Sequence, residues 1–405
     1  MIFSRSDARL RARPGSRTLV AALALTFAAG VVSPPVAGAA AGAGSGASAV
    51  LPAPTGPHPV GVDTLHLVDE SRADRWRPEE DREVMVSLWY PALAPSDMRA
   101  PYTTEAVSAA IIAGHGLALP GDTLTKVTTH SFAGAPGRPA PGGRPLVVLS
   151  PGAGLSRESL TTLAEDLASR GYVVAGIDHK YEATAEFPDG RVTECLLCDE
   201  ASSRELGAEL SRGRAADTSF VIDELTRDRP AWSRAALIDQ TRIAVAGHSL
   251  GGSAALTAMA TDDRIDAGVN LDGTFQTSAA EAGLDRPFLM MGAQAHAVPP
   301  GEEGHDETWP REWDHLQDWR RWLQVCNAGH MAFTDLPVLA DAFEVPGLAP
   351  TPDCENPRVG ELTGDRSAAV TRTYTGAFLD QHLRDVDSPL LRSPSRHYPE
   401  VEFHG

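Results

Sequence analysis

Outside its N-terminal segment, this 405-residue chain has no apolar run long enough to cross a bilayer. It is also short of positive charge, because 35 lysines and arginines stand against 54 aspartates and glutamates and leave a net charge of −19. An acidic surface argues against a nucleic-acid partner and against electrostatic docking on anionic membranes. We therefore expect a protein that neither binds nucleic acid nor inserts stably into a membrane.

Cysteine is scarce as well, with only Cys195, Cys198, Cys326 and Cys354. Cys195 and Cys198 have the spacing of a zinc half-site or a redox pair, but no second pair of Cys or His has matching ligand spacing. Four cysteines in an oxidising compartment favour disulfides, and three pairings are possible. We favour Cys195 with Cys198 and Cys326 with Cys354, and we expect no metal.

The N-terminal segment, residues 1–39, has the three parts of a signal peptide. Five arginines lie between residues 5 and 17, an apolar stretch covers residues 18–32, and Ala37-Gly38-Ala39 suits a signal peptidase. The absence of adjacent arginines favours general secretion over the twin-arginine route. We expect a secreted, extracellular protein whose mature chain, having lost five arginines and one aspartate, has a net charge of −23.

Residues 40–50 are rich in Gly, Ala and Ser and predict a flexible leader, so that residues 51–405 would form one catalytic domain. In that domain apolar runs alternate with helical patterns, which predicts a mostly parallel sheet with helices on both faces. The first two strands are expected to form an antiparallel hairpin at the sheet edge. The expected strands are residues 60–68, 84–90, 146–149, 172–177, 243–246, 267–271 and 288–291, and the expected helices are residues 104–113, 156–170, 205–225, 309–323 and 366–383.

The helix expected over residues 309–323 rests on aromatic spacing. Its apolar residues follow one another by threes and fours, which is typical of one packed helix face. They are Trp309, Trp313, Leu316, Trp319 and Leu323. Such a stripe indicates core packing rather than a ligand platform.

The strongest functional motif is Gly-His-Ser-Leu-Gly, residues 247–251. An apolar strand precedes it and a helix rich in small residues follows, as in the nucleophile elbow of strand–serine–helix folds. The sharp turn would hold Ser249 in a strained conformation at the strand tip, where only glycine fits on either side. Because the flanking elements match, we predict a nucleophile at Ser249 rather than a chance match among 37 glycines.

A glycine-rich loop, Ser-Pro-Gly-Ala-Gly at residues 150–154, follows an earlier buried strand. In such a sheet the active site lies at the carboxyl ends of the strands. The amides of Ala153 and Leu250 could there form an oxyanion hole, with each donor worth about 3 kcal/mol in the transition state. The alternative is an ordinary glycine-rich turn.

The serine needs a base, and His330 lies in the loop after the last expected strand–helix unit. His248 points away from its neighbour Ser249, which makes it a poor base but a candidate pocket residue. The remaining competitors, which packing or solvation can explain, are His296, His305 and His382.

For the acid, Asp272 directly follows the apolar run 267–271, where a carboxylate can accept from an imidazole Nδ1–H. Glu302, Glu303 and Asp306 follow the next strand, which is the more common place for the acid. Their polar surroundings indicate a solvated loop, so we favour Asp272.

These motifs resemble those of the plasma-type and intracellular type II platelet-activating factor acetylhydrolases and their exported bacterial relatives. The resemblance covers most of the mature chain, namely residues 51–57, 149–179, 238–252, 267–275 and the histidine loop. It implies an α/β-hydrolase fold and a Gly-His-Ser-x-Gly-Gly elbow. It also implies an acid in a Leu-Asp pair and a histidine before a Phe-x-Asp segment, which places these roles on Ser249, Asp272 and His330.

This sequence differs from the animal enzymes of the family in two segments, and these differences limit which properties of the family can be expected here. Pro151-Gly152-Ala153-Gly154 stands where the animal enzymes have His-Gly-Leu-Gly, and Gly273-Thr274-Phe275 replaces their Trp-Met-Phe. Backbone donors survive these changes, whereas acyl and head-group preference does not carry over.

We therefore expect a cofactor-independent serine hydrolase that acts on short or oxidised acyl esters in small-molecule or lipid substrates. A lipase or cutinase-like hydrolase of triglycerides or polyesters is the main alternative. A catalytically silent binding protein on the same scaffold is the alternative of another class. The sequence leaves oligomeric state open.

Overall fold

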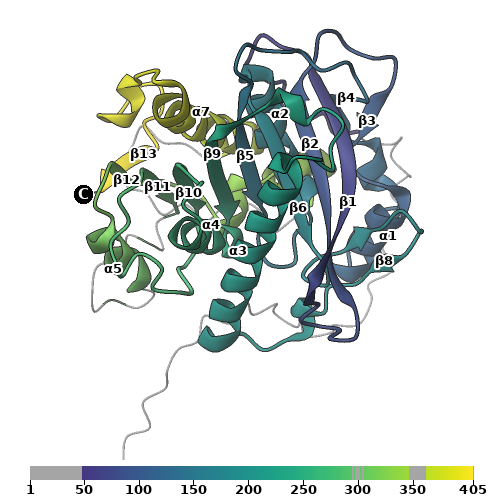
Figure 1. The fold of residues 1–405 in the computed structure, drawn as a ribbon, viewed down its shortest axis with the longest axis horizontal. Coiled ribbons are helices and arrows are strands. Elements are labelled where there is room, and N and C mark those ends of the chain that lie inside the picture. Colours follow the sequence, from purple (N-terminus) through teal and green to yellow (C-terminus); the bar gives the residue numbers. More distant parts are fainter. Residues whose placement is uncertain (1–47, 294–295, 297–301, 303–304, 346–361, 405) are drawn as a thin grey trace, which may run out of the picture. The chain divides into compact units, whose positions relative to one another are not determined.

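A mostly parallel sheet of 11 strands forms the centre of the computed structural model, in the order β13-β12-β11-β10-β9-β5-β6-β2-β1-β4-β3 (Figure 1). The structure describes residues 48–293, 296, 302, 305–345 and 362–404. The predicted signal peptide, most of the leader and Cys354 lie outside these residues. Residues 42–405 make up one compact unit.

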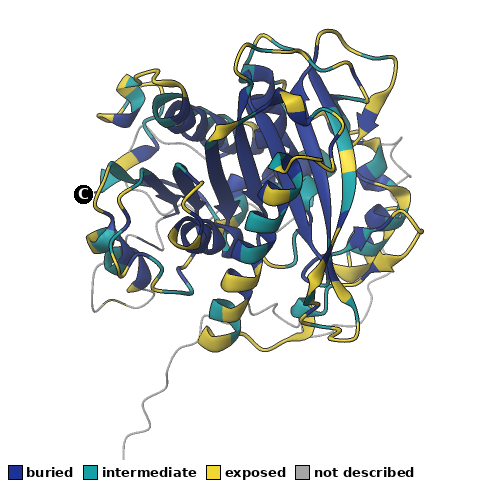
Figure 2. Cartoon of the chain, viewed as in Figure 1, coloured by how far each residue is buried: buried dark blue, intermediate teal, exposed yellow. Residues whose placement is uncertain are grey.

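The middle of the sheet consists of parallel strands whose side chains are almost all buried, as expected for strands covered on both faces (Figure 2). Neighbouring strands there pair in parallel from β6 through β5, β9, β10 and β11 to β12. These strands are β5 Arg144–Ser150, β6 Val173–His179, β9 Ile238–His248, β10 Ala267–Leu271, β11 Phe288–Gly292 and β12 Arg320–Val325.

Helices cover both faces of this sheet. Alternate strand residues pack into two apolar clusters, one with α2 and α7 and the other with α3, α4 and α5. The helices are α2 Thr161–Arg170, α3 Arg204–Thr226, α4 Leu250–Thr261, α5 Thr308–His315 and α7 Gly364–Arg384. The predicted α/β fold class is confirmed.

The antiparallel hairpin is confirmed as β1 Val60–Ala73 and β2 Asp81–Pro91, but its predicted place at the sheet edge is wrong. Strand β4, Thr128–Ala133, pairs in parallel with β1, and β3, Arg99–Pro101, pairs with β4 outside it. The buried positions of β4 include Thr129 and Ser131, so this strand has no apolar alternation for sequence reasoning to detect.

The helix predicted over residues 309–323 is confirmed only in its first part, because α5, Thr308–His315, ends early and β12 begins at Arg320. Leu323 packs into the cluster of α2 and α7, whereas Trp322 packs against the cluster of α3, α4 and α5. A sheet strand with helices on both faces needs apolar residues at successive positions. The aromatic spacing imitated a helix because it runs across this junction.

The other elements are short or lie at the margins. Helix α1, Glu105–Gly114, agrees with its prediction and is capped by Thr104, whose side chain accepts a hydrogen bond from Val107 N. The prediction missed α6 Leu336–Phe343, β13 Val401–His404 and the small pair β7 Ala185–Glu186 and β8 Val192–Thr193. No helix in the described part of the chain is both long and apolar enough to span a membrane.

Candidate active site

Ser249 makes the turn between β9 and α4 by itself, with φ 54° and ψ −122°. This positive φ is costly for a residue with a side chain, and close packing on both sides enforces it. A Cβ on Gly247 would lie 2.2 Å from the carbonyl carbon of Gly251, and one on Gly251 would lie 2.0 Å from Ser150 O. The turn therefore has the geometry of a nucleophile elbow.

The structure brings Ser249, His330 and Asp272 into one hydrogen-bonded row. His330 Nε2 lies 2.9 Å from Ser249 Oγ, and His330 Nδ1 lies 2.6 Å from Asp272 Oδ2. Asp272 directly follows β10 and His330 follows β12, so both come from carboxyl ends of parallel strands. The His330 side chain is 44% exposed and that of Asp272 only 4%, which places the carboxylate inside and the imidazole at the surface.

The environment of Asp272 keeps its carboxylate ionised. Burial alone would raise the pKa of Asp272, but hydrogen bonds from His296 and His330 outweigh burial and hold this pKa below its usual range. Its Oδ1 also accepts a hydrogen bond from Ala293 N, 2.5 Å away. A buried, ionised carboxylate beside the imidazole can orient the ring and stabilise its protonated form.

The predicted oxyanion loop lies against the start of α4. A Cβ on Gly251 would lie 2.0 Å from Ser150 O and 2.7 Å from Pro151 O, which shows how closely loop and helix approach. Within the described residues, neither Ala153 N nor Leu250 N donates to another backbone carbonyl. The role of both amides as oxyanion donors stays a prediction.

Buried polar contacts hold this loop in place. Gly154 N donates to Glu182 O at 2.9 Å, and Arg214 donates both to Pro151 O and to the carboxylate of Glu182. The predicted Cys195–Cys198 disulfide is present nearby. Cys326 is also disulfide-bonded, and its predicted partner lies outside the described residues.

A second serine–histidine–aspartate row lies beneath the same loop. Ser150 Oγ is 2.9 Å from His179 Nε2, and His179 Nδ1 is 2.8 Å from Asp217 Oδ2. All three side chains are buried, and Arg82 pairs with the Asp217 carboxylate. This buried row holds Ser150, the first residue of the predicted oxyanion loop.

His248 does not line a pocket, contrary to the prediction, because it is completely buried. Its Nε2 lies 2.8 Å from His330 O and donates to that carbonyl, and a Cβ on Gly152 would lie 2.8 Å from its Nδ1. Burial and then the charge of His330 lower the pKa of His248 to about 3, so it stays neutral. It supports the backbone of His330 instead of acting as a base.

Sequence reasoning missed the role of His296 and Asp306. The His296 ring lies between the two carboxylates, with Nε2 3.3 Å from Asp272 Oδ1 and Nδ1 2.8 Å from Asp306 Oδ2. Asp306 also accepts from the Thr274 hydroxyl and from the amide and hydroxyl of Thr308. The prediction of a solvated loop is therefore wrong for Asp306, and the detectable signal was a histidine just beyond the tip of β11.

Glu302 and His382 take no part in this row. Glu302 is exposed, and Glu303 lies outside the described residues. His382 packs against the rings of Trp319 and Phe378, as the packing interpretation predicts.

The Phe-x-Asp segment after the histidine has a visible structural purpose. Asp335 N donates to Ser159 O at 2.8 Å, and its carboxylate accepts from Thr162 N at the start of α2. At the other end of the histidine loop, Cys326 N donates to Glu400 O at 2.7 Å, directly before β13. The loop that carries His330 is thus fastened on both sides.

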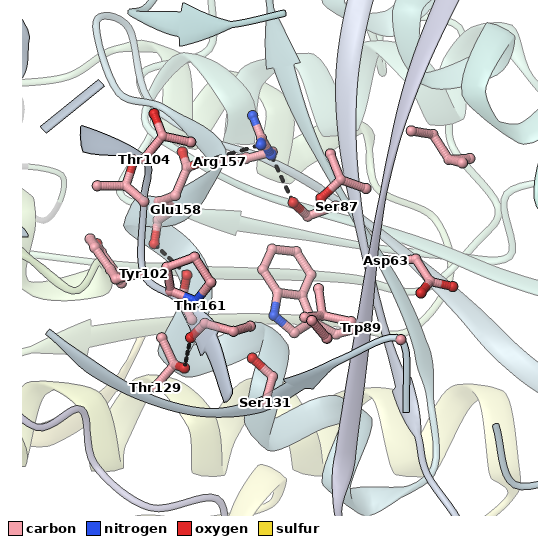
Figure 3. A pocket seen from close by; sticks show the side chains of 18 of the residues that line it. Asp63, Ser87, Trp89, Tyr102, Thr104, Thr129, Ser131, Arg157, Glu158 and Thr161 are labelled. Carbon is pink, nitrogen blue, oxygen red and sulfur yellow. Dashed lines mark hydrogen bonds and ion pairs between the residues drawn. The ribbon is translucent and has the colours of Figure 1, made fainter. Parts of the chain in front are cut away.

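A cavity of about 560 Å³ lies elsewhere, between β1, β2, β4 and the segment after the oxyanion loop. Figure 3 shows Trp89 among the side chains that line this cavity, and Arg157 Nε donates a hydrogen bond to Ser87 Oγ there. None of the five predicted site residues is among its lining residues. Over the described part of the chain, no cluster of three or more His, Cys, Asp or Glu side chains is placed to hold a metal ion.

Comparisons with known proteins find esterases. The family described as platelet-activating factor acetylhydrolase, isoform II, matches residues 43–188, and the PET hydrolase-like family matches residues 136–336. The probable 1-alkyl-2-acetylglycerophosphocholine esterase of Arthroderma benhamiae is 28% identical, over 88% of this chain and 94% of its own length. Cutinase est1 of Thermobifida alba is 27% identical over 46% of this chain and 53% of its own length.

Among solved structures, a ferulic acid esterase from Streptomyces cinnamoneus is 44% identical. The match has a TM-score of 0.78 and covers 89% of this chain and 100% of that chain. Fold and relatives together define a serine ester hydrolase of the α/β-hydrolase fold. The chain belongs to the platelet-activating factor acetylhydrolase family of esterases, as its resemblance in sequence implied.

The elbow analysis predicts opposite effects for two glycine substitutions. Gly247→Ala should destabilise the fold by more than about 2 kcal/mol, since its Cβ would meet backbone atoms that cannot move away. Gly213→Ala is the matched control, because a Cβ there meets nothing within 4 Å in the middle of α3 and should stabilise by up to about 1 kcal/mol. Urea unfolding measures both, and equal stability of the two variants would contradict the packing argument.

The position of His296 predicts how stability depends on pH. Burial acts to lower the pKa of His296, but hydrogen bonds to Asp272 and Asp306 outweigh it and raise this pKa from 6.5 to about 9. The resulting stabilisation is fully present below pH 6.5 and is lost as the pH rises through about 9. Urea titrations from pH 6 to 10 should show this loss in the wild type and not in His296→Gln. The same loss in both proteins would assign it to other groups.

Proposed function

We propose that this chain is an exported carboxylic-ester hydrolase that works through an acyl-enzyme on Ser249. The observation that carries the proposal is the row of contacts from Ser249 Oγ to His330 at 2.9 Å and from His330 to Asp272 at 2.6 Å. Export is supported by the sequence of residues 1–39 and by the Cys195–Cys198 disulfide, which suits an oxidising compartment.

In the proposed mechanism, His330 Nε2 takes the Ser249 hydroxyl proton as Oγ attacks the ester carbonyl carbon. The amides of Ala153 and Leu250 donate to the oxygen as it becomes negative. Asp272 orients the imidazole and stabilises its cation. His330 then protonates the departing alcohol, and the same residues activate the water that releases the acid from Ser249.

Removal of the nucleophile tests this mechanism. Ser249→Ala should lower kcat by roughly four to six orders of magnitude, because the covalent route is lost while binding contacts remain. Labelling by a fluorophosphonate probe should be lost with the activity, and the thermal unfolding midpoint should stay close to that of the wild type. A folded Ser249→Ala protein with activity within tenfold of the wild type would exclude Ser249 as the nucleophile.

Two acyl specificities have separate support. A short acyl chain, such as acetyl, on a phospholipid is supported by the probable 1-alkyl-2-acetylglycerophosphocholine esterase of Arthroderma benhamiae, which matches over 94% of its own length. A ferulate ester is supported by the ferulic acid esterase, which is 44% identical over its whole chain. The half-buried serine and the exposed imidazole are compatible with either, since the alcohol can extend into solvent.

A substrate series distinguishes these specificities. We expect turnover to fall steeply from p-nitrophenyl acetate to the palmitate ester, and we would compare an sn-2 acetyl phospholipid with methyl ferulate under the same conditions. A higher kcat/KM on the phospholipid supports the acetylhydrolase specificity, and a higher value on methyl ferulate supports the second candidate. A preference for long chains or a solid polyester would replace both with a lipase or cutinase-like activity.

A further inference from the structure

Asp272 contacts a second imidazole besides that of His330. Both nitrogens of the buried His296 ring face carboxylate oxygens, of Asp272 at 3.3 Å and of Asp306 at 2.8 Å. An ionised carboxylate can only accept hydrogen bonds, so each ring nitrogen has to supply a proton. His296 is therefore an imidazolium held between two carboxylates.

The position of this ring is fixed from several sides. It stacks on Trp309 with the ring centres 4.3 Å apart and the planes 13° from parallel, and Trp309 Nε1 donates to Gly273 O. A Cβ on Gly292 would lie between 2.8 and 3.0 Å from atoms of Trp309, Asp272 and His296. The glycine at the tip of β11 thus allows the three side chains to meet.

A charge count shows what the arrangement does. Before reaction, Asp272 and Asp306 are negative and His296 is positive, which leaves one negative charge beside a neutral His330. After His330 has taken the serine proton, two imidazolium ions face two carboxylates and the cluster is neutral. Asp306 offsets the charge of His296, so the charge of Asp272 remains available to His330.

We propose that His296, held by Asp306, is a positioning residue for the esterase reaction: it fixes the orientation of Asp272 and sets the charge that His330 experiences. This inference rests on the proposed roles of Ser249, His330 and Asp272. The contacts described for His296 are with Asp272, Asp306 and Trp309, and none is with Ser249. His296 acts through Asp272, as a neighbour that orients a catalytic group often does.

The groups that face this cluster are few among the described residues. His296 faces the two carboxylates and the Trp309 ring. His330 faces Asp272, Ser249 and the ring of His248, whose centre is 4.7 Å away. Since His248 stays neutral above a pH of about 3, the charged groups described around His330 at neutral pH are Asp272, with His296 and Asp306 behind it, and the Arg214–Glu182 pair beyond His248.

The test is the pH profile of kcat/KM on p-nitrophenyl acetate for His296→Gln, Asp306→Asn and the double variant. His296→Gln leaves the cluster with two negative charges, so the acid limb should move upward by about 1 pH unit, and kcat should fall roughly 10- to 100-fold with little change in KM. Asp306→Asn should not move the limb upward. In the double variant the charge equals that of the wild type, and the limb should return to its original position.

A purely structural role of His296 would not return the acid limb of the pH profile to its original position. A second substitution in a site that is already distorted would leave that limb displaced. The matched controls are His115→Gln and Asp263→Asn, at exposed positions away from the cluster, and they should change neither kcat nor the profile. Ser249→Ala in the same series reports separately on the nucleophile. Suppose that Ser249→Ala is inactive while folded His296→Gln keeps the acid limb of the wild-type pH profile. The positioning role of His296 is then excluded, and the proposed function remains supported.

A second measurement does not depend on the His296 variant folding. Ring-nitrogen NMR of the ¹⁵N-histidine-labelled wild type at pH 8 should show one buried histidine that still carries both protons and that loses this signature in Asp306→Asn. Absence of a doubly protonated histidine at pH 8 would overturn the inference.

Discussion

The buried carboxylate of Asp272 is the group on which the arrangement of the site depends. It sits at the tip of β10 and receives hydrogen bonds or ion pairs from the loop after β11 on one side and from the histidine loop after β12 on the other. A carboxylate taken out of water is stable only when donors surround it. The same contacts that stabilise its charge therefore fix the distance between the three strand tips, and with it the angle at which His330 meets Ser249.

The opposite side of the site is held by close backbone packing and by buried polar contacts. Helix α4 begins so close to the oxyanion loop that only glycine fits at Gly251, and this places the Leu250 amide and the loop carrying Ala153 beside the serine. Below the loop, Arg214 and the Ser150–His179–Asp217 row keep its backbone from relaxing. Rigid donors cost little reorganisation when negative charge develops, which is why such a loop needs dense support.

The sequence allowed the parallel sheet, the elbow and the row of Ser249, Asp272 and His330 to be predicted, because each depends on local pattern: an apolar run, a glycine spacing, a polar residue at a strand tip. Strand β12 was mistaken for helix because its packing partners lie far away in the chain. Strand β4 was missed because its buried positions are Thr and Ser. His296 and Asp306 were set aside for a related reason, since a polar, proline-rich stretch indicates solvent unless one knows that His296 stacks on Trp309 and pairs with Asp306.

The support of the histidine loop by β13 has a consequence for the order of folding. Cys326 N, at the start of that loop, donates to Glu400 O, and β12 pairs with Val401–His404, which lie far beyond the loop in the sequence. The strands next to Ser249 and Asp272 pair with neighbours in the middle of the sheet, whereas the loop of His330 acquires its final support only when β13 pairs with β12. A folding intermediate without β13 would therefore hold Ser249 and Asp272 in place before His330.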